Sequence, residues 1–302
     1  MKYQNPLRKN SRTSLQELKS KERGKYLPIF AINMESFFTG SSYDTPEDHP
    51  RLLGDRLFLN TRWYFVGGYT REIIRSRSVA VKGFYDRKAW AESSYRVFKL
   101  IEGCGGRFHL SGLENLISCH GPVVFISNHM STLETFVFPC IIAPLMEVTF
   151  VVKESLVKHP LFGPVMRARD PIVVKRNNPR EDFQTVMIKG KKFLARGTSV
   201  IIFPQSTRTV EFIPEEFNSL GIKLARAASV QVLPVAVKTD YWENGKYLKD
   251  AGPLNRNQPI HMVFGQPFSI QGSGKDEHKR IIDFIINNLQ QWGVVIKKGI
   301  VV

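Results

Sequence analysis

Short runs of apolar and β-branched residues recur from about residue 110, and segments with a helical pattern separate several of them. The pattern predicts strands at residues 122–127, 148–152, 172–174, 199–203, 230–237 and 260–264. It predicts helices at residues 179–196, 215–228 and 275–291. Helices that alternate with buried strands indicate an α/β fold, with a central mixed β-sheet flanked by helices on both faces.

The helix expected at residues 179–196 has the clearest boundaries. Asn178 can cap its first turn, and Pro179 suits the first helical position because that backbone nitrogen needs no intrahelical acceptor. Apolar residues recur on one face, and Gly197 can end the helix in a left-handed conformation. The helix is therefore expected to pack one side on the sheet.

The residues before this α/β region differ in character and define the predicted domain organisation. Residues 1–50 are polar and contain a Gly-, Ser- and Pro-rich stretch, which indicates a partly disordered leader. Residues 51–109 are expected to form a basic, aromatic, helical extension that faces a membrane, and residues 110–302 the α/β domain.

Within the extension, residues 62–107 carry ten Lys or Arg residues with aromatic residues between them. Aromatic rings at headgroup level and cations near lipid phosphates are typical of proteins that bind a membrane surface. Trp63, Trp90 and Phe98 are candidates for insertion. The alternative is a helical layer packed on the core with a solvated basic face, and the two interpretations are compatible.

The whole chain of 302 residues is strongly basic, with 43 Lys and Arg against 27 Asp and Glu and a formal net charge of +16. This charge favours an anionic partner. Because the sequence has no nucleic-acid-binding motif, that partner is expected to be an anionic membrane surface or a phosphorylated substrate, not nucleic acid.

The N-terminus lacks the apolar run of a secretion signal, and the longest uncharged apolar run, residues 135–146, is too short to span a bilayer. Three cysteines without metal-ligand spacing indicate a reducing compartment. The expected location is therefore the cytoplasmic face of a membrane, with peripheral attachment.

The most informative polar segment follows the first predicted strand of the α/β domain. His129 lies at the end of that strand, where open α/β sheets place their ligands, and Glu134 falls one helical turn into the next element. A carboxylate bonded to one imidazole nitrogen makes the other a better general base. Ser131 and Glu134 also fit a capping box, which is the structural alternative.

Two further segments supply candidate binding residues. Arg208 follows the strand at 199–203 in a polar loop with Gln205, Ser206 and Thr207, where its guanidinium can bind a phosphate in bidentate fashion. The alternative is a turn in which Arg208 pairs with a surface carboxylate such as Glu211. Lys153 and Arg176 lie at the ends of two other predicted strands, and an ordinary cationic connection is the alternative for that segment.

Together these segments resemble the four motif blocks of the glycerolipid acyltransferase family, typified by 1-acylglycerol-3-phosphate acyltransferase. Residues 128–134, NHMSTLE, resemble the block N-H-x-S-x-x-D, and Lys153-Glu154, Gly163 and Arg176 match the second block. Residues 203–209, FPQSTRT, resemble F-P-E-G-T-R-S, and Pro234 lies in an apolar run like the fourth block. The resemblance covers roughly residues 121–240.

The resemblance implies direct acyl transfer, with His129 as general base, Glu134 as its orienting acid, and Arg208 as a ligand of the acceptor phosphate, helped by Lys153 and Arg176. It implies no metal and no cofactor beyond the acyl-CoA or acyl carrier protein thioester that serves as co-substrate. The acceptor would be a lysophospholipid or glycerol-phosphate-like molecule in phospholipid synthesis.

Two departures from the family pattern bear on these expectations. Glu134 replaces the family's Asp, which changes its reach and keeps its charge. Gln205-Ser206 replaces Glu-Gly, which removes a negative charge beside Arg208 and leaves the acceptor open. An O-acyltransferase for another lipid, such as a lipid A-like or ornithine lipid-like acceptor, is therefore an alternative. So is a non-catalytic basic membrane-binding module, whereas a serine hydrolase using Ser131 or Ser206 is disfavoured because there is no GxSxG motif.

Overall fold

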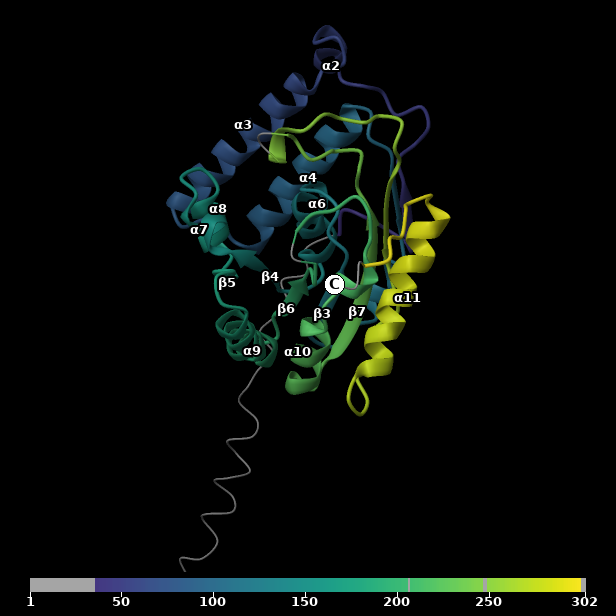
Figure 1. Ribbon diagram of the computed structural model, residues 1–302. Coiled ribbons are helices and arrows are strands. Elements are labelled where there is room, and N and C mark those ends of the chain that lie inside the picture. Colours follow the sequence, from purple (N-terminus) through teal and green to yellow (C-terminus); the bar gives the residue numbers. More distant parts are fainter. Residues whose placement is uncertain (1–35, 206, 247–248, 300–302) are drawn as a thin grey trace, which may run out of the picture. The chain divides into compact units, whose positions relative to one another are not determined.

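The computed structural model describes residues 36–205, 207–246 and 249–299 (Figure 1). Their strands form one eight-stranded sheet in the order β1-β2-β8-β7-β3-β6-β4-β5. The strands are β1 (Ser42–Asp44), β2 (Phe108–Ser111), β3 (Val123–Ser127), β4 (Val148–Lys153), β5 (Ile172–Val174), β6 (Ser199–Ile202), β7 (Gln231–Lys238) and β8 (Ile260–Phe264). The pairs β1–β2 and β7–β8 are antiparallel and all other pairs are parallel, which confirms the predicted mixed sheet.

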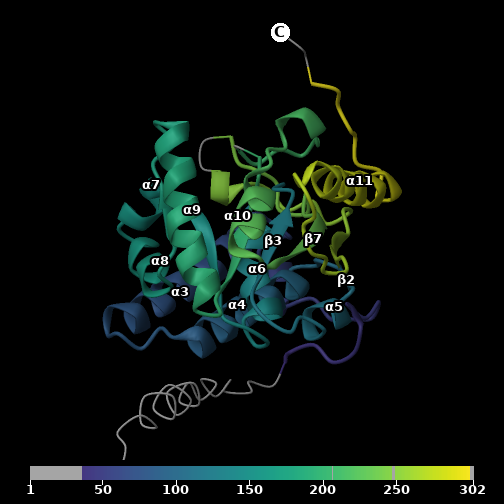
Figure 2. The same cartoon turned by 90° about the horizontal axis from the view of Figure 1, so that it is seen from below.

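Helices cover both faces of this sheet (Figure 2). One layer contains α3 (Arg62–Val81), α4 (Arg87–Gly103) and α6 (Leu133–Ile142), and the other contains α9 (Pro179–Ala195), α10 (Leu220–Ala228) and α11 (Lys275–Gln291). Shorter helices are α2 (Leu53–Leu57), α5 (Glu114–Ile117), α7 (Glu154–Lys158), α8 (Gly163–Ala168), η2 (Pro214–Glu216) and η3 (Lys249–Ala251). The central strand β3 is buried along its length: Val123 and Phe125 pack in one apolar cluster, and Val124 and Ile126 in the other.

Most predicted elements of the α/β region form at the expected places. The helix expected at residues 179–196 is α9, and the Asn178 side chain caps it by accepting hydrogen bonds from the backbone nitrogens of Arg180 and Glu181. The helix expected at 215–228 begins only at Leu220, because residues 214–216 form a 3₁₀ turn and Asn218 Oδ1 accepts a hydrogen bond from the Leu220 nitrogen.

Strands β1 and β2 were not among the predicted elements. They contain three and four residues and pair at the edge of the sheet, so neither has the long apolar run of a central strand. Strand β1 belongs to the segment expected to be a polar leader, and Phe38 in that segment packs edge-on against Phe98, with ring centroids 5.1 Å apart. Residues 1–35 of the expected leader lie outside the described residues.

Two of the three residues proposed for membrane insertion are in the core, so that prediction was wrong for them. Phe98 is fully buried and Trp90 is 6% exposed. Helix α4 packs on α6, and Trp90 lies edge-on to Phe150 in β4. Trp63, at the start of α3, is 58% exposed. The described residues include no helix that is long and apolar enough to cross a membrane.

The parallel arrangement places one set of loops together. The carboxyl ends of β3, β4, β5, β6 and β7 lie at the same edge of the sheet. The predicted site residues in the described chain lie at this edge, at the end of one of these strands or in the segment that follows it. Ligands of open α/β sheets bind at this edge.

Candidate active site

The exit of the chain from β3 is fixed by one buried amide. The Asn128 Nδ2 donates to the carbonyl of Val237 at 2.8 Å, and Asn128 Oδ1 accepts from the Val237 nitrogen at 2.9 Å. The side chain thus bonds to β7 as one more residue of β3 would. This pair of bonds determines where the next residue, His129, leaves the sheet.

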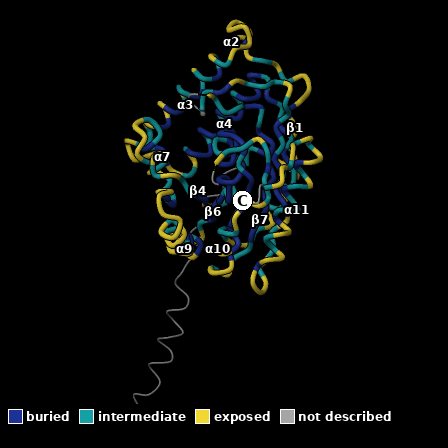
Figure 3. The backbone as a smooth tube through the Cα atoms, viewed as in Figure 1, coloured by how far each residue is buried: buried dark blue, intermediate teal, exposed yellow. Residues whose placement is uncertain are grey.

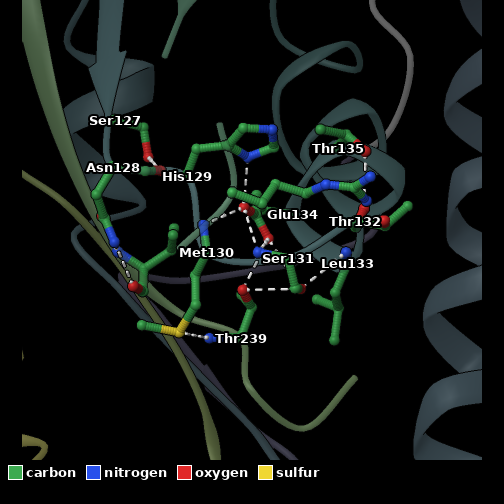
Figure 4. Close-up of polar contacts among 12 residues, drawn as sticks. Ser127, Asn128, His129, Met130, Ser131, Thr132, Leu133, Glu134, Thr135 and Thr239 are labelled. Carbon is green, nitrogen blue, oxygen red and sulfur yellow. Dashed lines mark hydrogen bonds and ion pairs between the residues drawn. The ribbon is translucent and has the colours of Figure 1, made fainter. Parts of the chain in front are cut away.

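His129 and Glu134 form a close pair at this point (Figure 4). His129 Nδ1 lies 2.8 Å from Glu134 Oε1, and the Glu134 side chain is completely buried while that of His129 is 16% exposed. An ionised carboxylate can only accept a hydrogen bond, so this contact assigns the imidazole proton to Nδ1. The other ring nitrogen, Nε2, is then the free base.

The buried Glu134 carboxylate is held by several donors. Oε1 accepts from the backbone nitrogens of Met130 and Ser131 at 2.8 and 3.0 Å, and Oε2 accepts from the Thr239 hydroxyl at 2.7 Å. Burial alone would raise the pKa of the Glu134 carboxyl, but the hydrogen bond and charge of His129, with the Thr239 hydrogen bond, hold that pKa below its usual value. The group is therefore an ionised partner for His129.

The geometry fits the catalytic interpretation of this segment, and it fits the capping box only in part, because α6 begins at Leu133 with Thr132 as its N-cap and no side-chain cap hydrogen bond. The Ser131 nitrogen donates to the Glu134 carboxylate, as in a capping box, but Ser131 Oγ accepts from the nitrogen of Leu133 and not from that of Glu134. The same Glu134 oxygen reaches His129. Ser131 is 1% exposed and its hydroxyl oxygen lies 3.0 Å from Thr239 Oγ1 and 3.2 Å from Glu134 Oε2, so it does not face a substrate as a nucleophile would.

The loop after β6 fixes the other side of the imidazole. Phe203 stacks on His129, with ring centroids 4.3 Å apart and an interplanar angle of 22°. Gln205 Oε1 accepts from the His129 backbone nitrogen at 2.7 Å, and Gln205 Nε2 donates to Thr209 Oγ1 at 2.9 Å. Gln205 is 6% exposed, so its amide positions the loop and His129, although it also borders the cavity described below.

Arg208 pairs with a carboxylate that the sequence did not reveal. Its Nη1 lies 2.6 Å from Asp250 Oδ1, and Thr132 Oγ1 donates to the same oxygen at 2.6 Å. The expected alternative, an ion pair of Arg208 with a surface carboxylate such as Glu211, therefore occurs with another partner: Asp250 is 37% exposed, whereas Glu211 pairs with Lys297 at 2.6 Å. Asp250 therefore connects Arg208 to Thr132, the residue that immediately precedes α6.

The predicted residues of the second block lie at two neighbouring strand ends. Lys153 is the last residue of β4, and Arg176 follows β5 with a left-handed φ of 62°. The Asp182 carboxylate on α9 stabilises this turn, because it accepts hydrogen bonds from the backbone nitrogens of Lys175 and Arg176 at 2.8 and 2.7 Å. Both Lys153 and Arg176 border the same cavity as His129.

One cavity of about 1080 Å³ collects the candidate residues. Six of the eight predicted site residues line it: His129, Lys153, Arg176, Gln205, Thr207 and Arg208. Glu134 lies behind His129, and Ser206 is outside the described residues. Much of the remaining wall is apolar and comes from α3, α4, α6, α8, α9 and β4, including Ile73, Val97, Phe136, Phe150, Val165 and Phe183.

Sequence reasoning missed three contributors to this site. Thr239, Asp250 and Phe203 contact Glu134, Arg208 and His129 respectively. Thr239 lies 105 residues from Glu134 and Asp250 lies 42 residues from Arg208, so no local spacing links them. Phe203 could have been found, because it begins the third block. No group of three or more metal-ligating side chains gathers among the residues that the structure describes.

Comparisons with known proteins agree with this geometry. The profile of the family described as Acyltransferase matches residues 107–238. A 1-acyl-sn-glycerol-3-phosphate acyltransferase of Pseudomonas aeruginosa is 30% identical over 186 residues, which cover 61% of this chain and 67% of that protein. One of Saccharomyces cerevisiae is 28% identical over 211 residues, covering 67% of this chain and 66% of that protein. About a third of each of these two relatives therefore has no counterpart in the match.

The crystal structure of the 1-acyl-sn-glycerophosphate (LPA) acyltransferase of Thermotoga maritima is similar in fold, with a TM-score of 0.60 at 19% identity over 78% of this chain and 95% of that one. A mixed sheet with a His–carboxylate pair at its carboxyl edge, together with these relatives, defines the chain as an acyltransferase. It belongs to the glycerolipid acyltransferase family that the 1-acylglycerol-3-phosphate acyltransferases typify.

Proposed function

We propose that this acyltransferase moves a fatty acyl group from acyl-CoA or acyl carrier protein to the free hydroxyl of a 1-acylglycerol 3-phosphate-like acceptor in phospholipid synthesis. The observation that carries the proposal is the placement of the His129 imidazole, paired with Glu134, and the Arg208 guanidinium on a single, largely apolar cavity. The names of the Pseudomonas and yeast relatives, both 1-acyl-sn-glycerol-3-phosphate acyltransferases, support this acceptor class.

The His129–Glu134 pair accounts for the chemistry. Nε2 of His129 removes the proton from the acceptor hydroxyl as its oxygen attacks the thioester carbonyl, and Glu134 stabilises the imidazolium that forms. When the tetrahedral intermediate collapses, the carbon–sulfur bond breaks and the leaving thiolate takes the proton from Nε2. The products are an ester and a free thiol, and the base returns to its starting state without a covalent acyl-enzyme.

The cavity offers places for both parts of such a substrate. Arg208 would bind the acceptor phosphate, with Lys153 and Arg176 as additional cations on the same wall. At about 1080 Å³ it slightly exceeds the roughly 300–1,000 Å³ typical of small-molecule pockets, so the apolar wall has room for acyl chains. The reaction as proposed uses the thioester co-substrate and no other cofactor.

The proposal includes peripheral attachment to the cytoplasmic face of an anionic membrane. Exposed apolar residues lie on α2, directly after it and on α3; this α2–α3 surface comprises Leu53, Leu57, Phe58, Leu59, Trp63, Ile74 and Val81. In Figure 3 most of α2 is coloured as exposed. Exposed cations accompany them at Arg56, Arg71, Arg75 and Lys82. On its other side α3 lines the cavity through Ile73 and Ser76, so one helix separates the active site from this surface.

The test is an assay of the purified full chain with a panel of acceptors. Lysophosphatidic acid, a lysophospholipid with a zwitterionic head group and a phosphate-free monoacylglycerol are each offered with acyl-CoA and with acyl carrier protein. We expect transfer to lysophosphatidic acid to be fastest and His129→Ala to abolish it. Faster transfer to an acceptor without a phosphate monoester would contradict the acceptor assignment. Wild-type function in folded His129→Ala would favour the non-catalytic alternative.

A further inference from the structure

The sequence lacks an acid beside Arg208, yet the structure has one there. Gln205 stands where the family pattern has Glu, and its amide is used by the His129 nitrogen and by Thr209. The carboxylate that contacts Arg208 comes instead from Asp250, which lies in η3 beyond β7. The acid that pairs with the Arg208 guanidinium is therefore Asp250, which lies 42 residues away in the sequence.

The contacts of Asp250 join two parts of the site. Its Oδ1 accepts from Arg208 Nη1 and from Thr132 Oγ1, each at 2.6 Å. Thr132 immediately precedes α6, the helix that carries Glu134. The Asp250 backbone is itself held, because Tyr69 OH in α3 donates to its carbonyl at 2.9 Å. Arg208 is therefore linked through one carboxylate to the helix of the His129–Glu134 pair.

We propose that Asp250 is a positioning residue that sets the distance between the phosphate anchor Arg208 and the general base His129, and thereby determines which acceptors react. This inference rests on the proposed function. A guanidinium has five N–H donors, so the bond from Nη1 to Asp250 leaves donors for a phosphate. The carboxylate also limits the rotamers of a long, flexible side chain, which reduces the ordering cost of binding the phosphate.

The test compares Asp250→Asn and Asp250→Glu with the wild-type enzyme in steady-state kinetics. Asp250→Asn retains the size of the side chain but removes the charge-assisted bond to Arg208, so the KM for lysophosphatidic acid should rise roughly tenfold. The KM for the acyl donor should stay within about twofold of the wild-type value, because only acceptor positioning is changed. The melting temperature should stay close to that of the wild type. Asp250→Glu keeps the carboxylate and should restore part of the loss.

Two further variants make the result specific. Thr132→Val removes the other bond to Asp250 Oδ1, and in combination with Asp250→Asn its effect should be less than additive. Asp283→Asn is the matched control, since Asp283 also pairs with a cation at 2.6 Å but lies on α11, away from the cavity. It should leave both Michaelis constants unchanged.

Several outcomes would overturn the inference. A lower acceptor KM in Asp250→Asn would mean that Asp250 competes with the phosphate for Arg208, and an equal rise of both constants would mean a general structural role. Arg208→Lys separates this question from the proposed function. If Arg208→Lys leaves the acceptor KM unchanged, the phosphate role of Arg208 is wrong; if it raises that constant and Asp250→Asn does not, only the role of Asp250 is wrong.

Discussion

At the scale of single residues, Glu134 combines two roles that its sequence presents as alternatives. It accepts a hydrogen bond from His129 Nδ1 and also from the backbone nitrogens of Met130 and Ser131. A substitution therefore affects catalysis and folding together, and the two effects must be measured separately.

Glu134→Gln distinguishes the two roles. The amide keeps an oxygen for the backbone donors but cannot stabilise an imidazolium, so kcat should fall by roughly 10²–10⁴ while most of the stability remains. Glu134→Ala leaves buried N–H groups without an acceptor and should cost a further ~1–3 kcal/mol in the free energy of unfolding. Single-turnover rates and denaturant titrations measure the two losses. A kcat near wild type in folded Glu134→Gln would contradict the orienting role.

The contribution of Glu134 to the stability of the fold depends on pH. The pKa of Glu134 in the folded chain is below its usual value, so the ionised carboxylate stabilises the fold at neutral pH. This contribution is lost as the pH falls through the folded-state pKa, where the carboxylate takes up a proton. Stability of Glu134→Gln should therefore change less on acidification than that of the wild type.

Arg208→Lys tests the neighbouring guanidinium. Lysine keeps the positive charge but loses the planar fork that matches both phosphate and carboxylate oxygens. We expect the KM for the acceptor to rise while the KM for the acyl donor changes little. Initial rates over a grid of both substrates give the two constants, and an equal rise in both would remove Arg208 from the acceptor phosphate site.

At the scale of elements, the sequence predicted what local pattern determines. Central strands such as β3 and β7 are nearly continuous apolar runs, and α9 carries its own cap at Asn178. The His129–Glu134 pair was also predictable, because its members are five residues apart. Asp250 and Thr239 reach the site only through tertiary folding, so no periodicity or spacing marks them.

The pairing of β2 with β8 gives an element-scale prediction. His261 on β8 is stacked between His109 on β2 and Trp292 after α11, with centroids 4.8 and 4.9 Å away. Burial, with the nearby His109 and Lys238, lowers the pKa of His261 to about 4. The unfolded chain takes up this proton below pH 6.5 and the folded chain only near pH 4, so stability should fall as the pH drops through this window.

His261→Phe measures this contribution, since it preserves a stacking ring and removes the titration. The difference in pH dependence between wild type and variant should be at most about 3 kcal/mol, and solvent screening of the half-buried ring reduces it. Urea titrations from pH 4 to 7 provide the measurement. Parallel stability curves for the two proteins would show that His261 keeps its ordinary pKa in the fold.

At the scale of the whole molecule, the basic and aromatic character of residues 62–107 divides between two surfaces. Trp90 and Phe98 are buried in the core, because α4 packs on α6 and the sheet. Trp63 and the outer residues of α3 are exposed. Composition correctly located this mixture in the sequence. It could not assign each ring to a side, because α3 and α4 have different neighbours in the fold.

The α2–α3 surface therefore makes a sharper prediction for membrane binding than the sequence did. Cations near an anionic leaflet contribute about 1 kcal/mol each and are screened by salt, whereas inserted apolar side chains are not. Binding of the full chain to vesicles should require anionic lipid and weaken, without vanishing, in high salt. Replacing Leu57, Phe58 and Trp63 together with Ala should remove the salt-resistant part, while replacing exposed Val295 and Ile188, on other surfaces, should not. Equal binding to neutral and anionic vesicles would reject the electrostatic part, and unchanged binding of the triple variant would show that another surface meets the lipid.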